Sequence, residues 1–254
     1  MHAPRDLPVM AADILARIRA RTPRVHCITN SVAQNFTANM LLAAGAVPSM
    51  TTDPAEIREF VASADALLVN LGTLDGKRQT AINDALGEAQ GRIPWVLDPV
   101  FVDRALTRAA FALELAAQRP SVMRLNDAEF SALAEEPAVS AALERYARER
   151  ETVVALTGDP DIVTDGARVN AIRNGHLLMA KVTAMGCAAS ALVGACLAVE
   201  ADAWQAAAAG LILIGIAGEL AAHAARGPGS LAAGILDALH ALDQRTIVER
   251  ARVE

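Results

Sequence analysis

Five short apolar runs, each followed by a longer segment with a helical pattern, constrain the fold of this chain more than any other feature. The runs are Val25–Thr29, Ala66–Asn70, Pro94–Asp98, Val122–Leu125 and Thr152–Leu156, and their length predicts buried strands. The intervening helices are expected at Val32–Ala44, Pro54–Ala64, Lys77–Gln90, Arg104–Ala117 and Pro137–Arg150. Such alternation requires right-handed crossovers, so we predict an α/β fold with a mainly parallel sheet covered by helices on both faces.

The pattern changes in the C-terminal half. Three short strand-like runs, Asp161–Thr164, Ala167–Arg173 and His176–Lys181, are separated by Asp-Gly and Asn-Gly pairs, which are strong hairpin signals. We therefore predict a short antiparallel meander after the parallel strands. Three helices, at Cys187–Val199, Ala203–Ala225 and Leu231–Arg245, should close a single domain that spans residues 1–254.

Composition excludes some classes of function. Aromatic residues make up only 3% of the chain, the formal net charge is -6, and no basic run is present. A nucleic-acid surface needs aromatic side chains for stacking or basic side chains for phosphates, so we expect no nucleic-acid partner.

The cysteines and the apolar segments favour a cytoplasmic protein. The three cysteines, Cys27, Cys187 and Cys196, have neither zinc-ligand spacing nor the even number of a disulfide framework. The start of the chain, with Arg5 and Asp6, lacks the apolar core of a secretory signal. The uncharged stretch from Val182 to Val199 is only weakly apolar in its first half, so we interpret it as a buried helix and expect no membrane contact.

The segment from Val182 to Cys187 lies between a strand-like run and a long helix. A glycine turn at Gly186 that opens a helix would present free backbone N–H groups to an anion, such as a phosphoryl group in transfer. Cys187 would stand at the helix N-terminus, where the pKa of a thiol tends to fall, and could accept a substrate proton. The alternative, a small buried cysteine after an ordinary turn, is favoured by composition alone.

Two acidic positions follow predicted strands. Asp98 ends a very apolar run and precedes Pro99, and Glu129 stands in the pattern Asn126-x-x-Glu129. Either carboxylate could hold Mg²⁺ at the ligand edge of the sheet. The alternatives are a turn at Asp98-Pro99 and a helix-capping box at Asn126 and Glu129.

Two further segments carry local signals. Asn30 or Ser31 should cap the following helix. That helix carries a dense set of polar side chains, which could line a pocket for a heterocycle or simply face solvent: Gln34, Asn35, Thr37 and Asn39. Gly227-Pro228-Gly229-Ser230 predicts a turn with Ser230 as helix cap. No Walker phosphate loop, dinucleotide fingerprint, GxSxG elbow or HExxH motif is present.

In their order along the chain, these segments resemble the hydroxyethylthiazole kinase family. The specific matches are Asn35-Phe36-Thr37-Ala38-Asn39 and Lys181-Val182-Thr183-x-x-Gly186-Cys187. Weaker matches lie at residues 25–30, 45–50, 70–74, 97–100, 126–129, 155–158 and 227–230, so the resemblance extends over nearly the whole chain.

The resemblance implies a ribokinase-like fold and transfer of the ATP γ-phosphate to the alcohol of 4-methyl-5-(2-hydroxyethyl)thiazole, for thiamine biosynthesis or salvage. It also implies a homotrimer with sites between subunits. By matching position, Met50, Asn30 and the backbone of Ala184 would contact the thiazole substrate, Arg124 and Thr157 would bind ATP, and Gly186 would belong to the anion hole. Cys187 would be the base, and Asp98 and Glu129 would organise Mg²⁺.

This chain departs from the family at the phosphate side. The family usually has glycine at the position of Ala184 and at the position of Leu125. Where the family has a small glycine-rich loop after Asp98-Pro99-Val100, this chain has Phe101-Val102-Asp103-Arg104. The stretch between Glu129 and Thr152 is also shorter. Two alternatives therefore stay open: a ribokinase-like kinase for another small alcohol, of the hydroxymethylpyrimidine or pyridoxal type, and a thiazole-binding protein with impaired phosphotransfer.

Overall fold

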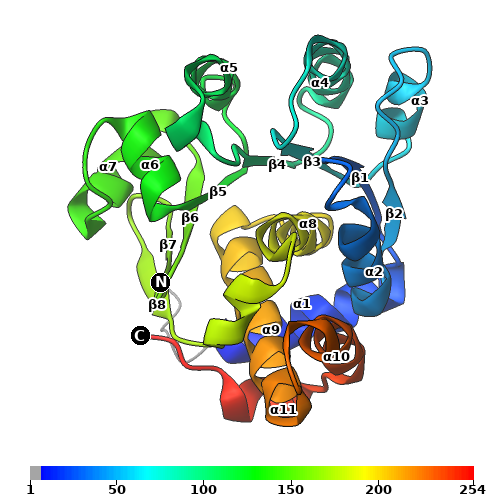
Figure 1. Cartoon of the computed structure of the whole chain (residues 1–254), viewed down its shortest axis with the longest axis vertical. Helices are drawn as coiled ribbons and strands as arrows, with labels where there is room; N and C mark the ends of the chain where they lie inside the picture. Colours follow the sequence, from blue (N-terminus) through cyan, green and yellow to red (C-terminus); the bar gives the residue numbers. More distant parts are fainter. Residues whose placement is uncertain (1–6) are drawn as a thin grey trace.

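A computed structural model describes residues 7–254 and contains one eight-stranded sheet (Figure 1). The strands lie in the order β2-β1-β3-β4-β5-β6-β7-β8. The first six strands in this order pair in parallel, and β7 and β8 add an antiparallel hairpin. Their bounds are β1 Arg24–Ile28, β2 Val47–Ser49, β3 Ala66–Asn70, β4 Trp95–Asp98, β5 Val122–Asn126, β6 Val153–Thr157, β7 Asp161–Thr164 and β8 Val169–Ile172. The predicted α/β class and mainly parallel sheet are thus confirmed, while Arg5 and Asp6 lie outside the described residues.

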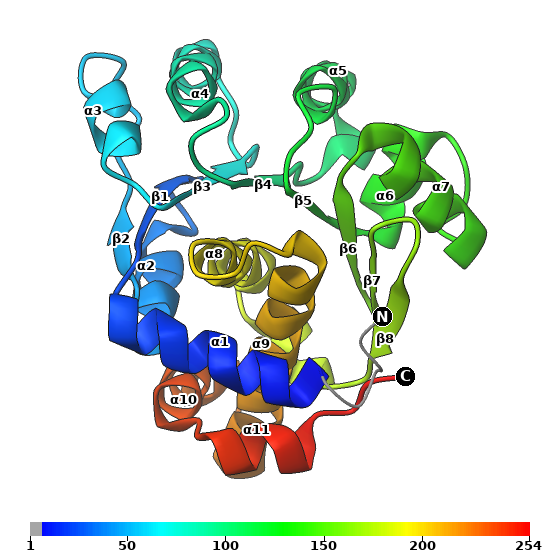
Figure 2. The same cartoon turned by 180° about the vertical axis from the view of Figure 1, so that it is seen from behind.

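Helices cover both faces of the sheet (Figures 1 and 2). One face carries α3 Ile57–Ala62, α4 Gly76–Ala89, α5 Leu106–Ala116, α6 Asp127–Ala134 and α7 Ser140–Arg150. On the other side lie α1 Leu7–Arg21, α2 Gln34–Ala44, α8 Met185–Leu197, α9 Ala203–Ala224, α10 Pro228–Ala241 and α11 Gln244–Arg250.

Each face of the sheet supports its own hydrophobic core, because successive side chains of a strand point to opposite faces. In β3, for example, Leu68 packs into the core with α8 and α9, while Leu67 and Val69 pack into the core with α4 and α5. All five side chains of β3 are buried, as a strand covered on both faces requires.

The strand order reverses between β1 and β3. The chain leaves β1 for α2 on one face and leaves β3 for α4 on the other, so the two outgoing loops diverge at the carboxyl ends of these strands. Ligands of open α/β sheets bind in the crevice at such a switch point. Asn30 and Asn70 lie there, where the Asn30 Nδ2 donates to Asn70 Oδ1 at 3.2 Å.

The predicted third strand of the meander is wrong. Leu177–Lys181 is a 3₁₀ helix, capped by the side chain of His176, and Leu177 is exposed. The outer edge of β8, which a third strand would need, is instead paired with residues 252–254. There Ala171 and Glu254 exchange two backbone hydrogen bonds of 2.8 and 2.9 Å.

Other boundaries also differ from the prediction. The short strand β2 and the helix α6 were not expected as elements, and the last predicted helix is two helices, α10 and α11. Ser230 is not an N-cap: α10 begins at Pro228 after Gly227, and the Ser230 Oγ accepts from the Arg226 N–H within the turn.

Helix α9 is long and apolar enough to cross a membrane by length and composition alone. Its apolar window is 78% buried inside the protein, where it packs against α1, α8 and α10. We therefore interpret α9 as a core helix. The stretch beginning at Val182 likewise contains the buried helix α8.

Candidate active site

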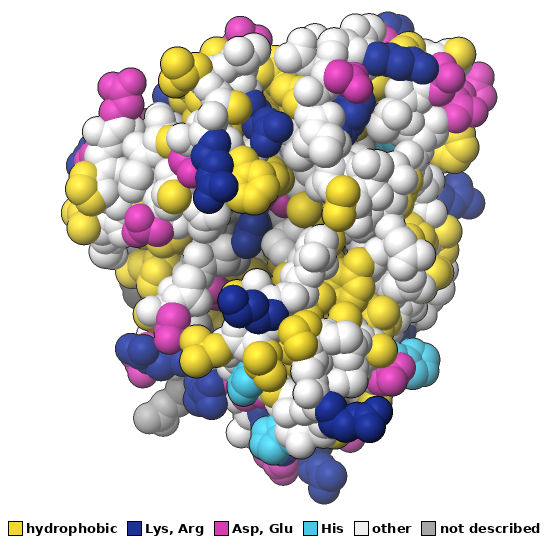
Figure 3. All heavy atoms as spheres, viewed as in Figure 1, with side chains coloured by type: hydrophobic (Ala, Val, Ile, Leu, Met, Phe, Trp, Pro, Cys, Tyr) yellow, Lys and Arg dark blue, Asp and Glu magenta, His cyan; other side chains and the backbone are white. Residues whose placement is uncertain are grey.

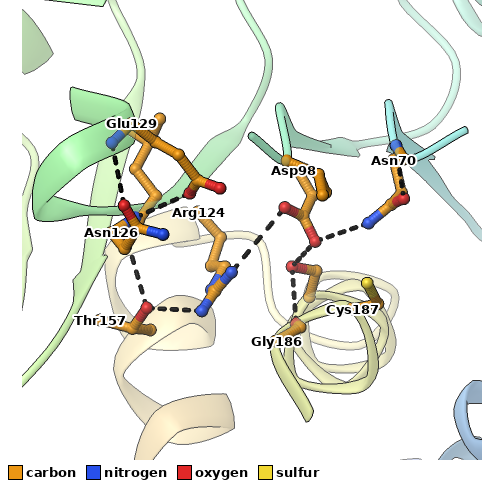
Figure 4. A network of polar contacts seen from close by, with 12 residues as sticks. Asn70, Asp98, Arg124, Asn126, Glu129, Thr157, Gly186 and Cys187 are labelled. Atoms are coloured by element: carbon orange, nitrogen blue, oxygen red, sulfur yellow. Dashed lines mark hydrogen bonds and ion pairs between the residues drawn. The ribbon is translucent and has the colours of Figure 1, made fainter. Parts of the chain in front are cut away.

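Asp98 is the centre of a buried polar network at the carboxyl edge of the sheet (Figure 4). Its side chain is fully buried, and its Oδ2 accepts hydrogen bonds from Asn70 Nδ2 at 2.8 Å and from Ser190 Oγ at 2.9 Å. Its Oδ1 has no hydrogen-bond partner among residues 7–254 and lies 3.8 Å from Nη1 of Arg124. Burial raises the pKa of Asp98, and the charge of Arg124 opposes that rise.

Asn30 and Asn70 connect this carboxylate to the thiol of Cys187. The Nδ2 of Asn30 lies 3.5 Å from Cys187 Sγ as well as near Asn70, and Asn30 Oδ1 accepts from the Ala33 N–H at 3.0 Å. Asn30 therefore fixes the turn before α2, as a capping residue would, although the helix itself begins later, at Gln34. The side-chain amide of Asn30 thus forms hydrogen bonds both to the turn before α2 and to the thiol of Cys187.

The polar set on α2 does not form one continuous surface. Asn39 donates to the backbone and side chain of Asn35 within the helix, at 2.9 and 3.3 Å. Thr37 is fully buried, and its Oγ1 has no hydrogen-bond partner.

Cys187 lies in the first turn of α8, as expected, but the predicted fall of its pKa is wrong. Burial raises the pKa of the thiol to about 11, and the negative charge of Asp98 adds to this effect. Hydrogen bonds from Asn70 and Asn30 and the charge of Arg124 oppose it without cancelling it. Near neutral pH this cysteine is therefore a protonated thiol.

Arg124 leaves β5 and packs against the start of α8 (Figure 4). Its Nη2 donates to Thr157 Oγ1 at 2.5 Å, and Thr157 Oγ1 in turn lies 3.2 Å from the Leu125 carbonyl oxygen. A Cβ at Gly186 would stand 2.7 Å from Nη1 of Arg124, so any other residue here would force this guanidinium to move. Because β5 and β6 pair in parallel, Arg124 and Thr157 both lie toward the carboxyl ends of their strands.

The start of α8 has no side-chain cap. Its N-cap residue, Ala184, has left-handed backbone angles (φ 67°, ψ 9°). The first N–H groups of a helix lack intrahelical acceptors, so those of Gly186 and Cys187 are available to a ligand. Ala184 thus occupies a conformation that glycine adopts without strain, at the position where the family usually has glycine.

Glu129 is a capping residue, as one of its two sequence interpretations predicted. Asn126 Oδ1 accepts from the Glu129 N–H at 2.9 Å, and Glu129 Oε2 accepts from the Asn126 N–H at 3.0 Å. Its other oxygen accepts from the Phe101 N–H at 2.9 Å. Glu129 therefore joins α6 to the loop after β4, where Val100 and Phe101 both have positive φ.

Met50 directly follows the edge strand β2, and its side chain packs, partly buried, against the core that also contains residues of α2 and α8. Buried His26 contacts both neighbours of Met50, through the side-chain Oγ of Ser49 at 2.7 Å and the backbone carbonyl of Thr51 at 3.1 Å. Burial lowers the pKa of His26 to about 4, so this imidazole is neutral and donates from Nε2 to Thr51. The expected contact of Met50 with substrate stays a prediction.

The structure brings together seven of the residues singled out in the sequence: Asn30, Asp98, Arg124, Glu129, Thr157, Gly186 and Cys187. Sequence reasoning gave no role to the side chains of Asn70 and Ser190, which hold Asp98, or to those of Arg78 and Asp161. The spacing of Ser190, one turn after Gly186 on α8, could have indicated it, since its Oγ also lies 3.2 Å from the Gly186 carbonyl.

Lys and Arg side chains gather around a central hollow on the face seen in Figure 3. This mainly parallel sheet, with an uncapped helix start, a largely buried arginine and a carboxylate at its carboxyl edge, defines an enzyme of the ribokinase-like kinase class. The family model for hydroxyethylthiazole kinases matches residues 15–245. The chain belongs to the hydroxyethylthiazole kinase family.

Comparison with individual proteins leads to the same family. A probable hydroxyethylthiazole kinase of Agrobacterium fabrum is 44% identical over 98% of this chain and 97% of its own length. A hydroxyethylthiazole kinase of Cronobacter sakazakii is 44% identical over 91% of this chain and 92% of its own. The solved structure of a hydroxyethylthiazole kinase from Pyrococcus horikoshii OT3 superposes with a TM-score of 0.92 at 38% identity, covering 96% of this chain and 98% of that one.

Proposed function

We propose that this chain transfers the γ-phosphoryl group of ATP to the hydroxyl of 4-methyl-5-(2-hydroxyethyl)thiazole, in the supply of thiamine, as a single kinase domain over residues 1–254. Membership of the hydroxyethylthiazole kinase family supports this reaction. The observation that carries it is the packing of Arg124 against Gly186 at the uncapped start of α8, beside Asp98.

Arg124, Thr157 and the N–H groups of Gly186 and Cys187 would hold the phosphates. A phosphoryl group in transfer carries its charge on its outer oxygens, so fixed donors aimed at them lower the barrier. Arg124 is suited to this task because its side chain is largely buried, at 14% exposed, and is already oriented by Thr157.

The alcohol would lie beside Cys187, with Asn30, Met50 and the backbone of Ala184 lining the thiazole pocket. Because the thiol is protonated at neutral pH, it would orient the hydroxyl by hydrogen bonding and need not remove the proton before transfer. A loose transition state requires little help from a base, and the hydroxyl proton would pass late in the reaction from the new ester oxygen to an oxygen of the transferred phosphoryl group or to water.

Mg²⁺ would be held mainly by the nucleotide. The described residues contain no group of three or more His, Cys, Asp and Glu side chains that could hold a metal ion. Mg²⁺ bound to phosphates needs only one or two carboxylates and keeps several waters. Asp98 fits, because its buried Oδ1 lacks a hydrogen-bond partner, and Glu129 fits only through water, since both its oxygens hold backbone N–H groups. When bound, the ion neutralises charge on the β- and γ-phosphates.

A homotrimer in the cytoplasm is the proposed form. Exposed apolar side chains gather in the α2–β2 region that contains Met50, namely Val32, Leu42 and Val47. Burial of these side chains against a neighbouring copy would place Met50 of one protomer near the site of another. Sedimentation velocity at micromolar concentration tests this, and a monomer would contradict it.

An ADP-release assay with hydroxyethylthiazole, ATP and Mg²⁺ tests the reaction. We expect turnover with the thiazole alcohol and at least tenfold lower kcat/KM with hydroxymethylpyrimidine or pyridoxal. Arg124→Ala should raise the KM for ATP, and Arg58→Ala, which removes an exposed arginine from α3, should not. Faster turnover of another alcohol would reassign the substrate.

A second candidate is a thiazole-binding protein that has lost phosphotransfer. The positive φ angles of Val100, Phe101 and Ala184, all on the phosphate side, favour it. Calorimetry that detects thiazole binding, together with no ADP release at any ATP concentration, would establish this candidate and exclude the kinase.

A further inference from the structure

Arg78 is a buried arginine in the first turn of α4 whose guanidinium is enclosed by one loop. Only 8% of the residue is exposed. Its Nη2 donates to the Asn70 carbonyl at 3.0 Å, and its Nη1 donates to the Gly72 carbonyl and to the carbonyl and Oγ1 of Thr73, the last two at 3.1 and 3.0 Å. The side chain of Arg78 thus donates hydrogen bonds to three backbone carbonyls at the end of β3 and in the loop that follows it.

Three carbonyl oxygens and one hydroxyl accept from this buried charge, while the Asp75 carboxylate accepts only from the Arg78 backbone N–H and acts on the guanidinium from a longer distance. Among residues 7–254, no ion pair within 4.0 Å involves Arg78. A buried cation is costly unless all its donors are satisfied, and the buried Nε of Arg78 has no hydrogen-bond partner among the described residues, so an apolar side chain would serve a purely stabilising role better. The bonds of Arg78 go instead to the loop whose conformation sets the positions of Asn70 and Gly72.

Both loop residues bear on the site. Asn70 Oδ1 accepts from Asn30 Nδ2 and from the Gly72 N–H, at 3.2 and 3.0 Å, while Asn70 Nδ2 donates to Asp98. Gly72 packs so closely on the Asn30 amide that a Cβ would lie 2.7 Å from Nδ2. Movement of the loop would therefore displace Asn30 and Asn70 together, and with them the hydrogen bonds to Cys187 and Asp98.

We propose that Arg78 is a positioning residue of the phosphotransfer site, which fixes the loop at residues 70–73 so that Asn70 and Asn30 hold Asp98 and Cys187. It contacts neither substrate and acts through the two asparagines. Only the kinetic measurement of this role rests on the proposed function. The reactivity of Cys187 reports the positions of Asn30 and Asn70 without any turnover.

The experiment compares the wild-type protein with Arg78→Ala, Arg78→Lys and the control Lys77→Ala. Lys77 is the preceding, exposed residue of α4, and its removal makes the same change of charge. Two quantities are measured below the unfolding temperature of each variant: steady-state kinetics, and the rate of iodoacetamide alkylation against pH. Cys27 and Cys196 are fully buried, so alkylation of the folded protein reports Cys187.

We expect Arg78→Ala to lower kcat roughly ten- to hundredfold while the KM for ATP changes little, since Arg124 and Thr157 are untouched. Loss of the asparagine donors should also slow alkylation of Cys187 at pH 10 by roughly threefold. Arg78→Lys keeps the charge and most of the stem but not the fork of donors, so it should show a smaller loss in both quantities. Lys77→Ala should match the wild type.

A folded Arg78→Ala or Arg78→Lys protein with wild-type kcat and a wild-type alkylation profile would overturn the proposal, even if its melting temperature fell. If Arg78→Ala does not fold, Arg78→Lys alone decides between the two outcomes. If the wild type does not turn over the thiazole, the proposed function fails, and the alkylation profiles still test the role of Arg78.

Discussion

Gly186 and Arg124 are in such close contact that a Cβ at position 186 would lie within 2.7 to 3.0 Å of three guanidinium atoms. The absence of a side chain on α8 therefore creates the space in which the arginine of β5 lies. Two elements far apart in the sequence, at residues 122–126 and 185–197, meet at this point.

Gly186→Ala should displace the Arg124 guanidinium and raise the KM for ATP by roughly tenfold or more. The matched control is Gly194→Ala on the same helix, where a Cβ would lie 3.4 Å from Val25 Cγ1, an ordinary contact. Initial-rate kinetics at saturating thiazole alcohol measure both variants. An unchanged ATP KM in Gly186→Ala would remove Arg124 from the nucleotide site.

Ala184→Gly should increase the free energy of unfolding by about 1 kcal/mol, because the left-handed backbone at this position is strained for alanine. Urea unfolding followed by circular dichroism measures the difference. Ala188→Gly, in the right-handed interior of α8, should instead destabilise the protein by at least about 1 kcal/mol. A loss of stability in Ala184→Gly would show that the positive φ is not kept in solution.

Cys187→Ala should slow turnover roughly ten- to hundredfold and not abolish it, since positioning and charge stabilisation supply most of the acceleration. The alkylation rate of the wild-type thiol should keep rising up to its pKa of about 11, and kcat should show no inflection from this group between pH 6 and 9. Complete inactivity of a variant that folds and binds both substrates would instead make the thiol indispensable to the chemical step.

Asp161 provides a pH-dependent test of stability. Burial raises the pKa of its carboxyl to about 6 from 3.8, against the hydrogen bond from the Gly158 N–H and the charge of Arg124. The folded protein therefore binds this proton more tightly than the unfolded chain, so the stabilising contribution is complete below pH 3.8 and lost as pH rises through 6.

Asp161→Asn, which cannot ionise, should accordingly be more stable than the wild type above pH 6, by up to about 3 kcal/mol, and equal to it below pH 4. Thermal unfolding in a series of buffers measures the difference, and Asp159→Asn, an exposed change in the same turn, is the control. A constant difference at every pH would exclude ionisation of Asp161 as its cause.

The sequence predicted the parts of the fold that depend on local pattern. Five of the six parallel strands coincide with apolar runs, since a strand buried on both faces needs nothing else, and Asn126 with Glu129 form the expected capping box. The false strand at 176–181 has a long-range cause: its place beside β8 is taken by residues 252–254, about 80 positions away.

The candidate site was predictable where its residues stand in recognisable segments, and not where only the fold brings a residue to the site. Asp98, Arg124 and Cys187 come from distinctive segments, whereas Asn70 and Ser190 matter only because β3 and α8 converge on Asp98. The direction of the Cys187 pKa was also beyond sequence reasoning. A helix start lowers the pKa of a thiol, but here burial and the nearby Asp98 have the larger effect.

The pairing of residues 252–254 with β8 makes the two edges of the sheet different. On the β8 side, the exchange between Ala171 and Glu254 occupies N–H and C=O groups through which chains could otherwise polymerise. On the other side only the three-residue β2 remains, and its Pro48 has no N–H to donate. A neighbouring molecule can therefore extend this sheet only weakly, which favours association through side chains over growth into fibrils.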